Sequence, residues 1–166
     1  MTSAIPINAM WMQIPGRASS THVEPQDLHH LVGKAFLTAL LLTGSVERAE
    51  AAIVEGNTKM DLDNASGEAL FREAVNAAVE PPSVTSRQLP EDLERASSML
   101  PFELRRVLHL PPALRHCFVL RFLVGLPREA CARLLHLETP QVDERARTAM
   151  LELAAIQRNR EVLRAN

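Results

Sequence analysis

The sequence has almost no aromatic side chains: of its 166 residues none is tyrosine, one is tryptophan and five are phenylalanine. Aliphatic side chains must therefore fill the core, and hydrophobic residues, at 46%, are numerous enough for a folded protein. Alanine and leucine dominate and β-branched residues are few, which favours helices over strands. We expect an all-α protein.

Cysteines and long apolar runs are also scarce. Cys117 and Cys131 lie in apolar stretches with helical spacing, so we expect buried free thiols rather than a disulfide or metal ligands. The apolar stretch of residues 35–42 is much shorter than the ~18 residues that a membrane-spanning helix needs. The first residues lack the basic patch of a signal peptide. We therefore expect a cytoplasmic protein with no membrane contact.

The chain has no strong net charge, since its 18 basic and 20 acidic side chains leave a balance of −2. The distribution is uneven, however. Residues 1–110 hold 9 Lys+Arg against 14 Asp+Glu, whereas residues 111–166 hold 9 against 6. The balance is thus −5 in the first part and +3 in the second. Any contact with nucleic acid is therefore expected in the C-terminal part, whose field attracts phosphate.

Patterns that carry enzyme chemistry are missing. There is no glycine-rich phosphate loop, and the six histidines show no metal-ligand spacing such as HExxH. His29 and His30 are neighbours on a predicted helix and point to different faces, which is a poor arrangement for holding a metal. We expect no enzymatic activity, no metal and no cofactor.

The first half of the chain predicts a loose arm and a helical module. Residues 1–26 contain prolines and small polar residues without periodicity and read as a flexible N-terminal arm. In residues 27–80, apolar spacing predicts a helix over 27–43 that Gly44 ends. Ser45 is a predicted N-cap of a second helix, residues 57–65 a loop or frayed helix, and Ser66 an N-cap of a third.

Residues 81–100 are predicted to link this module to the C-terminal one. Their first part, 81–90, is rich in proline, which excludes helix and stiffens the chain. A short amphipathic piece from about Glu91 to Leu100 follows. The linker therefore separates two small helical modules, over residues 27–80 and 101–166.

Residues 101–166 carry the most organised pattern. A helix opens at Pro111-Pro112 and closes at Gly125, and a second begins near Pro127. Residues 136–138 form a three-residue turn, Thr139 is the predicted cap, and a long final helix follows. Two helices joined by a tight turn, the second carrying arginines, are typical of a helix-turn-helix. Apolar spacing predicts the inner side of the final helix at Val142, Ala146, Ala149, Met150 and Leu153.

Two segments resemble a known family. LPPALRHCFVLRFLVGL at residues 110–126 resembles the LPPxxRxVFxLRxxxGLxxxEIA opening of region 4 in sigma-70 family sigma factors of the extracytoplasmic-function type. GSVERAEAAIVE at 44–55 and LFREAVNAA at 70–78 resemble the GDxxDAEDLVQE and WLYRIARNLA segments of region 2. The segments come in the family's order, with a linker between them.

The resemblance implies a role in transcription initiation. In such proteins region 2 docks on RNA polymerase and helps to melt the −10 element, and region 4 places a recognition helix in the major groove at the −35 element. By position, the base-reading face is implied to be Thr139, Gln141, Asp143, Glu144 and Arg145, with Arg147 and Thr148 one turn on. The arginines implied to hold the DNA backbone are Arg115, Arg121, Arg128 and Arg133.

The chain departs from the family at contact positions. Asp143 and Glu144 replace a Lys-Ser pair, and two carboxylates facing phosphates are repelled. His136 replaces the turn glycine, although a left-handed turn residue is easiest for glycine. In the region 2-like half, Ala51 and Val54 replace acidic and amide residues. Of the aromatic and basic side chains that melting requires, only Phe71 and Arg72 are present.

Two functions stay open at this point. The first is a divergent sigma factor or DNA-binding regulator whose partners are promoter DNA and RNA polymerase. The second is a protein-interaction module that keeps the sigma shape but has lost those contacts, and that binds an anti-sigma-like protein or a second copy of itself. The basic C-terminal part favours the first, and the acidic substitutions favour the second.

Overall fold

Every described element of the chain is helical in the computed structural model, which describes residues 25–59, 66–80 and 90–165. The predicted all-α fold is therefore confirmed. In chain order the elements are α1 Pro25–Thr43, α2 Val46–Lys59, α3 Gly67–Val79, α4 Pro90–Met99, α5 Phe102–Arg105, a 3₁₀ turn η3 Arg106–His109, α6 Pro112–Phe118, a π-helical turn η4 Val119–Leu123, α7 Arg128–Leu135 and α8 Thr139–Ala165.

The helix ends of the first half follow the sequence signals. Gly44 ends α1 with a φ of 65°, a left-handed conformation that glycine adopts without strain. The hydroxyl of Ser45 accepts a hydrogen bond from the N–H of Arg48 at 3.4 Å, and that of Ser66 accepts one from the N–H of Ala69 at 3.1 Å. Both serines satisfy a donor at the start of a helix, as predicted.

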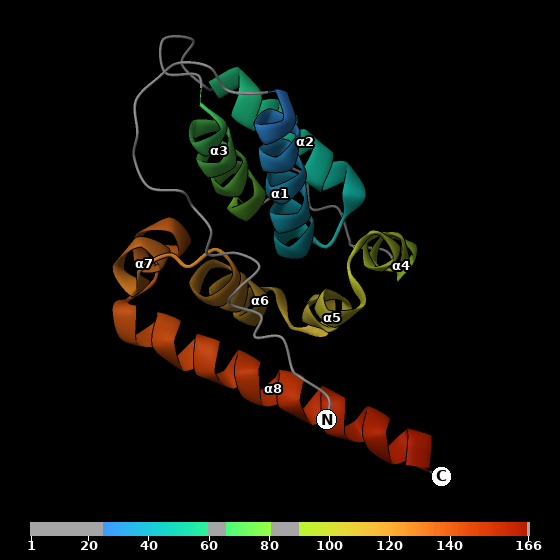
Figure 1. Cartoon of the computed structure of the whole chain (residues 1–166). Helices are drawn as coiled ribbons and strands as arrows, with labels where there is room; N and C mark the ends of the chain where they lie inside the picture. Colours follow the sequence, from blue (N-terminus) through green and yellow to red (C-terminus); the bar gives the residue numbers. More distant parts are fainter. Residues whose placement is uncertain (1–24, 60–65, 81–89, 166) are drawn as a thin grey trace.

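Helices α1, α2 and α3 pack side by side in one half of the molecule (Figure 1). The approach of α2 to α3 is very close at Gly56. A Cβ atom on Gly56 would lie 2.7 Å from the backbone nitrogen of Ala74 and 3.0 Å from its Cα. Small residues at this crossing, Ala52, Gly56 and Ala74, allow the two backbones to meet.

The second half is organised along α8. This helix of 27 residues is about 40 Å long and lies along α6 and α7 at the edge opposite α1–α3 (Figure 1). Its buried residues agree with the predicted inner side, except for Met150, which is 51% exposed. The next position on a helix is turned by about 100°, so Met150 points away from the face that buries Ala149.

A single core joins the two halves. Apolar side chains of α1, α2 and α3 belong to the same buried cluster as those of η4, α7 and α8, and Leu114 and Phe118 of α6 pack against it. The two modules predicted over residues 27–80 and 101–166 therefore pack against each other. The largest fully buried side chains of the described residues are Leu40, Leu41, Leu42, Val107, Cys117, Val119, Leu120, Cys131 and Val142.

The predicted linker is shorter than expected at its C-terminal end. Residues 81–89 lie outside the described residues, but the remainder of the interval 81–100 forms α4 and its exit. Ala96 and Leu100 are buried in the common core, so this piece is part of the fold rather than a spacer. The amphipathic pattern of residues 91–100 did predict a helix here.

The predicted N-terminal arm, residues 1–26, extends two residues into α1, which begins at Pro25, and the loop or frayed helix predicted over 57–65 overlaps the last turn of α2, which ends at Lys59. The remaining residues of both segments, 1–24 and 60–65, lie outside the described residues. The free, buried state of Cys117 and Cys131 is confirmed. None of the described helices combines the length and the apolar character needed to cross a bilayer.

The crossing at Gly56 predicts opposite effects for two glycine-to-alanine changes. Gly56→Ala forces the backbones of α2 and α3 apart and should lower the free energy of unfolding by about 1–3 kcal/mol. Gly33→Ala, on α1 with no atom near its Cβ position, should raise it by about 0.5–1 kcal/mol through helix propensity alone. Urea unfolding followed by circular dichroism measures both. Equal effects of the two substitutions would contradict the close approach.

Candidate nucleic-acid interface

Helix α7 and the long helix α8 are joined by a tight turn. His136 takes the left-handed conformation, with φ 52° and ψ 45°. The N–H groups of His136 and Leu137 donate to the carbonyls of Arg133 at 3.4 Å and Ala132 at 2.9 Å, which closes the end of α7. A left-handed residue is therefore required where the sequence lacks glycine, and histidine is among the residues that tolerate it.

The first turn of α8 is held by a side chain of its own. The Oε1 atom of Gln141 accepts a hydrogen bond from the N–H of Glu138 at 3.0 Å. This contact is the returning half of a capping box, in which the third helical residue reaches back to the N-cap. Thr139, predicted as the cap, is instead the first helical residue. Gln141 keeps its exposed amide NH₂ as a hydrogen-bond donor.

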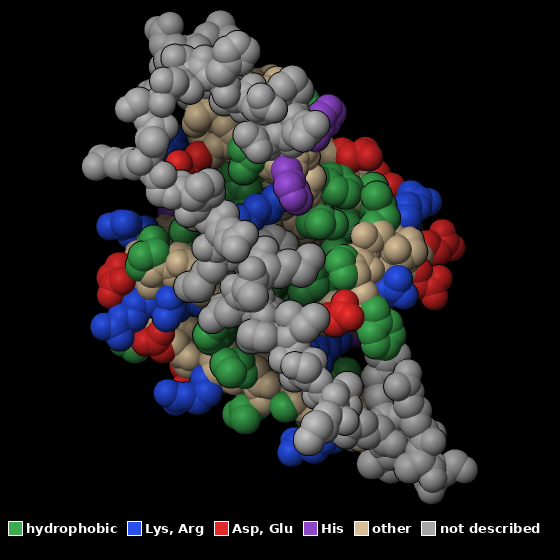
Figure 2. Space-filling view, viewed as in Figure 1, with side chains coloured by type: hydrophobic (Ala, Val, Ile, Leu, Met, Phe, Trp, Pro, Cys, Tyr) green, Lys and Arg blue, Asp and Glu red, His purple; other side chains and the backbone are tan. Residues whose placement is uncertain are grey.

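Two of the predicted DNA-contacting arginines are paired with acids on the same surface. The guanidinium of Arg128 lies 2.9 Å from Glu129 and 3.5 Å from Asp143, and that of Arg147 lies 3.2 Å from Glu144. The bonds to Glu129 and Asp143 raise the pKa of Arg128. Basic and acidic side chains consequently alternate over α7 and the start of α8 (Figure 2).

These pairs are weak. All of the paired side chains are at least 40% exposed, and pairs of this kind contribute about 0.2–1 kcal/mol each. A phosphate group can therefore displace Asp143 or Glu144 from its arginine at small cost. The pairing lowers the positive potential of the surface but does not block it.

The other predicted residues of this surface differ in their surroundings. Arg133 is exposed and forms no ion pair within the described part of the chain. Thr148 donates its hydroxyl to the carbonyl of Glu144 at 3.0 Å, and Thr139 is half-buried.

Arg145 is half-buried and lines a pocket on the inner side of α8. Arg121 donates to the carbonyl of Leu126 at 2.8 Å, which holds the exit of η4.

The prediction that Arg115 contacts DNA is wrong. Arg115 is only 3% exposed and lies on the inner side of α6. Its Nη1 and Nη2 atoms donate to the carbonyls of Leu108 and Leu42, both at 3.2 Å. Its Nε–H has no partner among the described residues. The guanidinium therefore bridges the two halves of the molecule instead of facing solvent.

The acceptor in this bridge is the C-terminal end of α1. The carbonyl of Leu42 also accepts a hydrogen bond from Nε2–H of His116 at 3.0 Å. The last turn of α1 has no basic residue of its own, although the C-terminal end of a helix carries a partial negative charge that favours donors and cations. Arg115 and His116 supply them from α6.

Burial lowers the pKa of both groups. Desolvation, together with the charge of Arg48, lowers the pKa of Arg115 to about 10. Desolvation also lowers the pKa of His116 from its ordinary value of 6.5, partly opposed by the bond to Leu42. The sequence patterns did not predict this bridge. The one available signal was the absence of a basic residue from the last turn of α1, which indicates that a donor must come from elsewhere in the chain.

Comparison with protein-family models finds no match for the chain, and comparisons with curated proteins and with solved structures also find none.

The bridge predicts a stability loss on removal of Arg115. Arg115→Ala takes away both hydrogen bonds and opens a cavity, which should lower the free energy of unfolding by about 2–4 kcal/mol. Arg115→Met keeps much of the side-chain volume without a buried charge and should lose less. Urea unfolding measures both variants. An alanine variant as stable as the unmodified chain would contradict the bridge.

The lowered pKa of His116 predicts a pH dependence. Between the folded and the unfolded pKa, the unfolded chain binds more protons at this residue, so stability rises with pH. The contribution of neutral His116 to the free energy of unfolding is complete above pH 6.5 and is lost as the pH falls below that value. Glu47 and Glu129 affect stability in a more acidic pH range, because their pKa values are lowered from 4.5.

Unfolding free energies from pH 7.5 to 5.0 test this expectation. His116→Gln, which keeps a donor for the carbonyl of Leu42, should flatten the dependence above pH 5. The exposed His109 provides the control, because His109→Gln should keep the slope of the unmodified chain. A slope that His116→Gln leaves unchanged would assign the pH effect to other groups.

Proposed function

We propose that the protein is a divergent sigma-factor-like regulator of transcription initiation that binds duplex DNA through the α7–α8 helix-turn-helix. The observation that carries this proposal is the exposed start of α8 behind a tight left-handed turn. Pro140, Gln141, Glu144 and Arg147 are all exposed there. A helix N-terminus presented in this way after a short helix is the arrangement that enters the major groove.

The contacts divide into positioning and base recognition. Arg128 and Arg133 on α7, and Arg147 on α8, are exposed and able to reach phosphate oxygens, which fix the orientation of a protein on DNA. The free amide NH₂ of Gln141 and the carboxylate of Glu144 are at the start of α8, where base edges are read. Gln141 cannot bond adenine through both amide atoms while its oxygen caps the helix.

The expected binding is weak and moderately dependent on salt. Three arginine–phosphate contacts correspond to a slope of log K against log salt of about −3. Asp143 and Glu144 oppose binding both by repelling phosphate and by pairing with two of the arginines. The surface is thus suited to a regulator with modest affinity rather than to tight operator binding.

The surface of the region 2-like half is better suited to docking on a protein such as RNA polymerase than to melting promoter DNA. Phe71, the aromatic residue in the segment that resembles the melting region, is half-buried, and the Lys34 ammonium lies 5.5 Å from the centre of its ring. Such a ring is not free to stack on an extruded base. On the outer side of α2, Val54 is 64% exposed, beside the exposed Ala51.

Releasing the paired arginines tests the DNA-binding proposal. The double variant Asp143→Asn/Glu144→Gln removes two negative charges, frees Arg147 and leaves Arg128 paired with Glu129 alone. Affinity for duplex DNA at low salt should therefore rise roughly tenfold or more. The control Glu50→Gln/Glu68→Gln makes the same change in net charge on the other half and should have little effect. Fluorescence anisotropy at several salt concentrations measures both.

Failure of this experiment would favour the second candidate. If neither the unmodified chain nor the released variant binds DNA at low ionic strength, the helix-turn-helix is not a DNA surface. The acid–arginine pairs and the exposed Val54 of α2 would then support a protein-interaction module with a sigma-like shape. Sedimentation of the full chain would test association with a second copy.

A further inference from the structure

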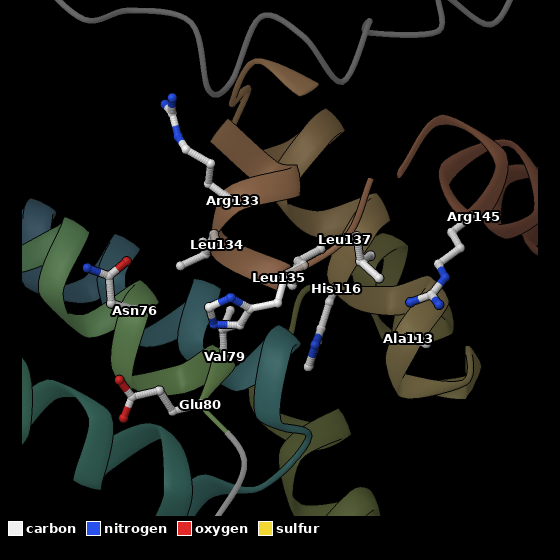
Figure 3. A pocket seen from close by; sticks show the side chains of 11 residues that line it. Asn76, Val79, Glu80, Ala113, His116, Arg133, Leu134, Leu135, Leu137 and Arg145 are labelled. Atoms are coloured by element: carbon white, nitrogen blue, oxygen red, sulfur yellow. The ribbon is translucent and has the colours of Figure 1, made fainter. Parts of the chain in front are cut away.

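A pocket lies between the two halves, on the inner side of the helix-turn-helix. Its volume is about 390 Å³, and its walls come from the end of α3, from α6, from the last turn of α7, from the α7–α8 turn and from α8 (Figure 3). This volume is within the range of small-molecule sites in proteins. Because segments from both halves form it, the pocket exists only when the halves are packed together.

The walls of the pocket combine an apolar surface with positive charge. Leu134, Leu135 and Leu137 supply much of the apolar part. Arg145 contributes a guanidinium group, whereas the guanidinium of Arg133 points away from the pocket in Figure 3. Glu80 is the one carboxylate among the lining residues. In Figure 3, Glu80 and Arg145 lie at opposite sides of the pocket, so the side formed by α8 is positive.

Arg145 differs from its neighbours on α8. Arg147 is exposed and paired with Glu144, whereas Arg145 is half-buried and forms no ion pair within the described part of the chain. Its side chain extends toward Ala113 and His116 in Figure 3. Its charge also acts on the buried thiol of Cys117, whose pKa it lowers against the larger effect of burial.

A partly desolvated guanidinium at an apolar wall fits one class of ligand. Its planar fork can donate two parallel hydrogen bonds to a carboxylate or a phosphate, and such bonds strengthen where water is displaced. The leucines can cover an apolar body attached to that anion. A neutral apolar molecule would leave Arg145 without an acceptor, and a cation would be repelled.

We propose that this pocket binds a small organic anion, with its charged group at Arg145 and its apolar part against Leu134, Leu135 and Leu137. Binding there bridges α8 to α3 and α6, so the occupied pocket stabilises the packed arrangement of the two halves. The proposal does not rest on DNA binding, because it concerns the inner side of α8 and is tested without nucleic acid.

Titration of the full chain with matched probes tests the proposal. Hexanoate and hexyl phosphate are the anionic probes, and hexanol is the uncharged control. Isothermal titration calorimetry and the shift in melting temperature should show saturable binding of at least one anion, and none or much weaker binding of hexanol. Loss of the guanidinium in Arg145→Gln should weaken binding at least about tenfold.

Two further variants separate the pocket from the rest of the surface. Arg147→Gln removes a charge two residues away on the exposed side of α8 and should leave binding unchanged. Ala113→Phe fills the pocket from α6 without removing a charge and should abolish it, with helicity checked by circular dichroism. The proposal is overturned if neither anion saturates, if hexanol binds equally well, or if Arg145→Gln and Arg147→Gln have the same effect.

Discussion

The carbonyl oxygen of Leu42 joins the two halves of this protein by accepting hydrogen bonds across their contact. It lies in the last turn of α1, which has no basic side chain of its own, and it accepts from both Arg115 and His116 on α6. A buried guanidinium without a carboxylate partner is costly, and here carbonyl oxygens alone compensate it. A movement of α6 away from α1 would remove the Leu42 acceptor and leave the guanidinium with the carbonyl of Leu108 alone.

The position of the helix-turn-helix follows from this constraint. Helix α8 packs on α6 through Val142, Ala146 and Ala149, and α6 is held against α1. The α7–α8 turn is thereby placed beside the end of α3, where the pocket forms. The same helix consequently has two different sides, one facing solvent with Arg147 and one facing the pocket with Arg145.

The electrostatics of the solvent-facing side depend on a balance of small energies. Exposed ion pairs contribute little, so Asp143 and Glu144 reduce the attraction for phosphate mainly through their own charge rather than by holding arginines in place. On the pocket-facing side, partial burial raises the free-energy cost of the unpaired Arg145 guanidinium and makes it more selective for an anion.

Local sequence signals determined the secondary structure of this protein. Gly44, Ser45, Ser66 and the turn at His136 all act within four residues, and caps and turns are decided at that range. The apolar spacing of α8 likewise predicted its inner side except for Met150. The buried thiols followed from their apolar neighbours.

Only the tertiary structure decided what the arginines do. Arg115 bonds a carbonyl 73 residues away, and no pattern around Arg115 indicates that the end of α1 will lie there. Arg147 pairs with Glu144 on the same turn of α8, which is a local contact, whereas Arg128 reaches Asp143 on another helix and Arg145 lines a pocket. The reason is physical: a long charged side chain follows whichever acceptor the packed backbone brings within reach, and that packing depends on the whole core.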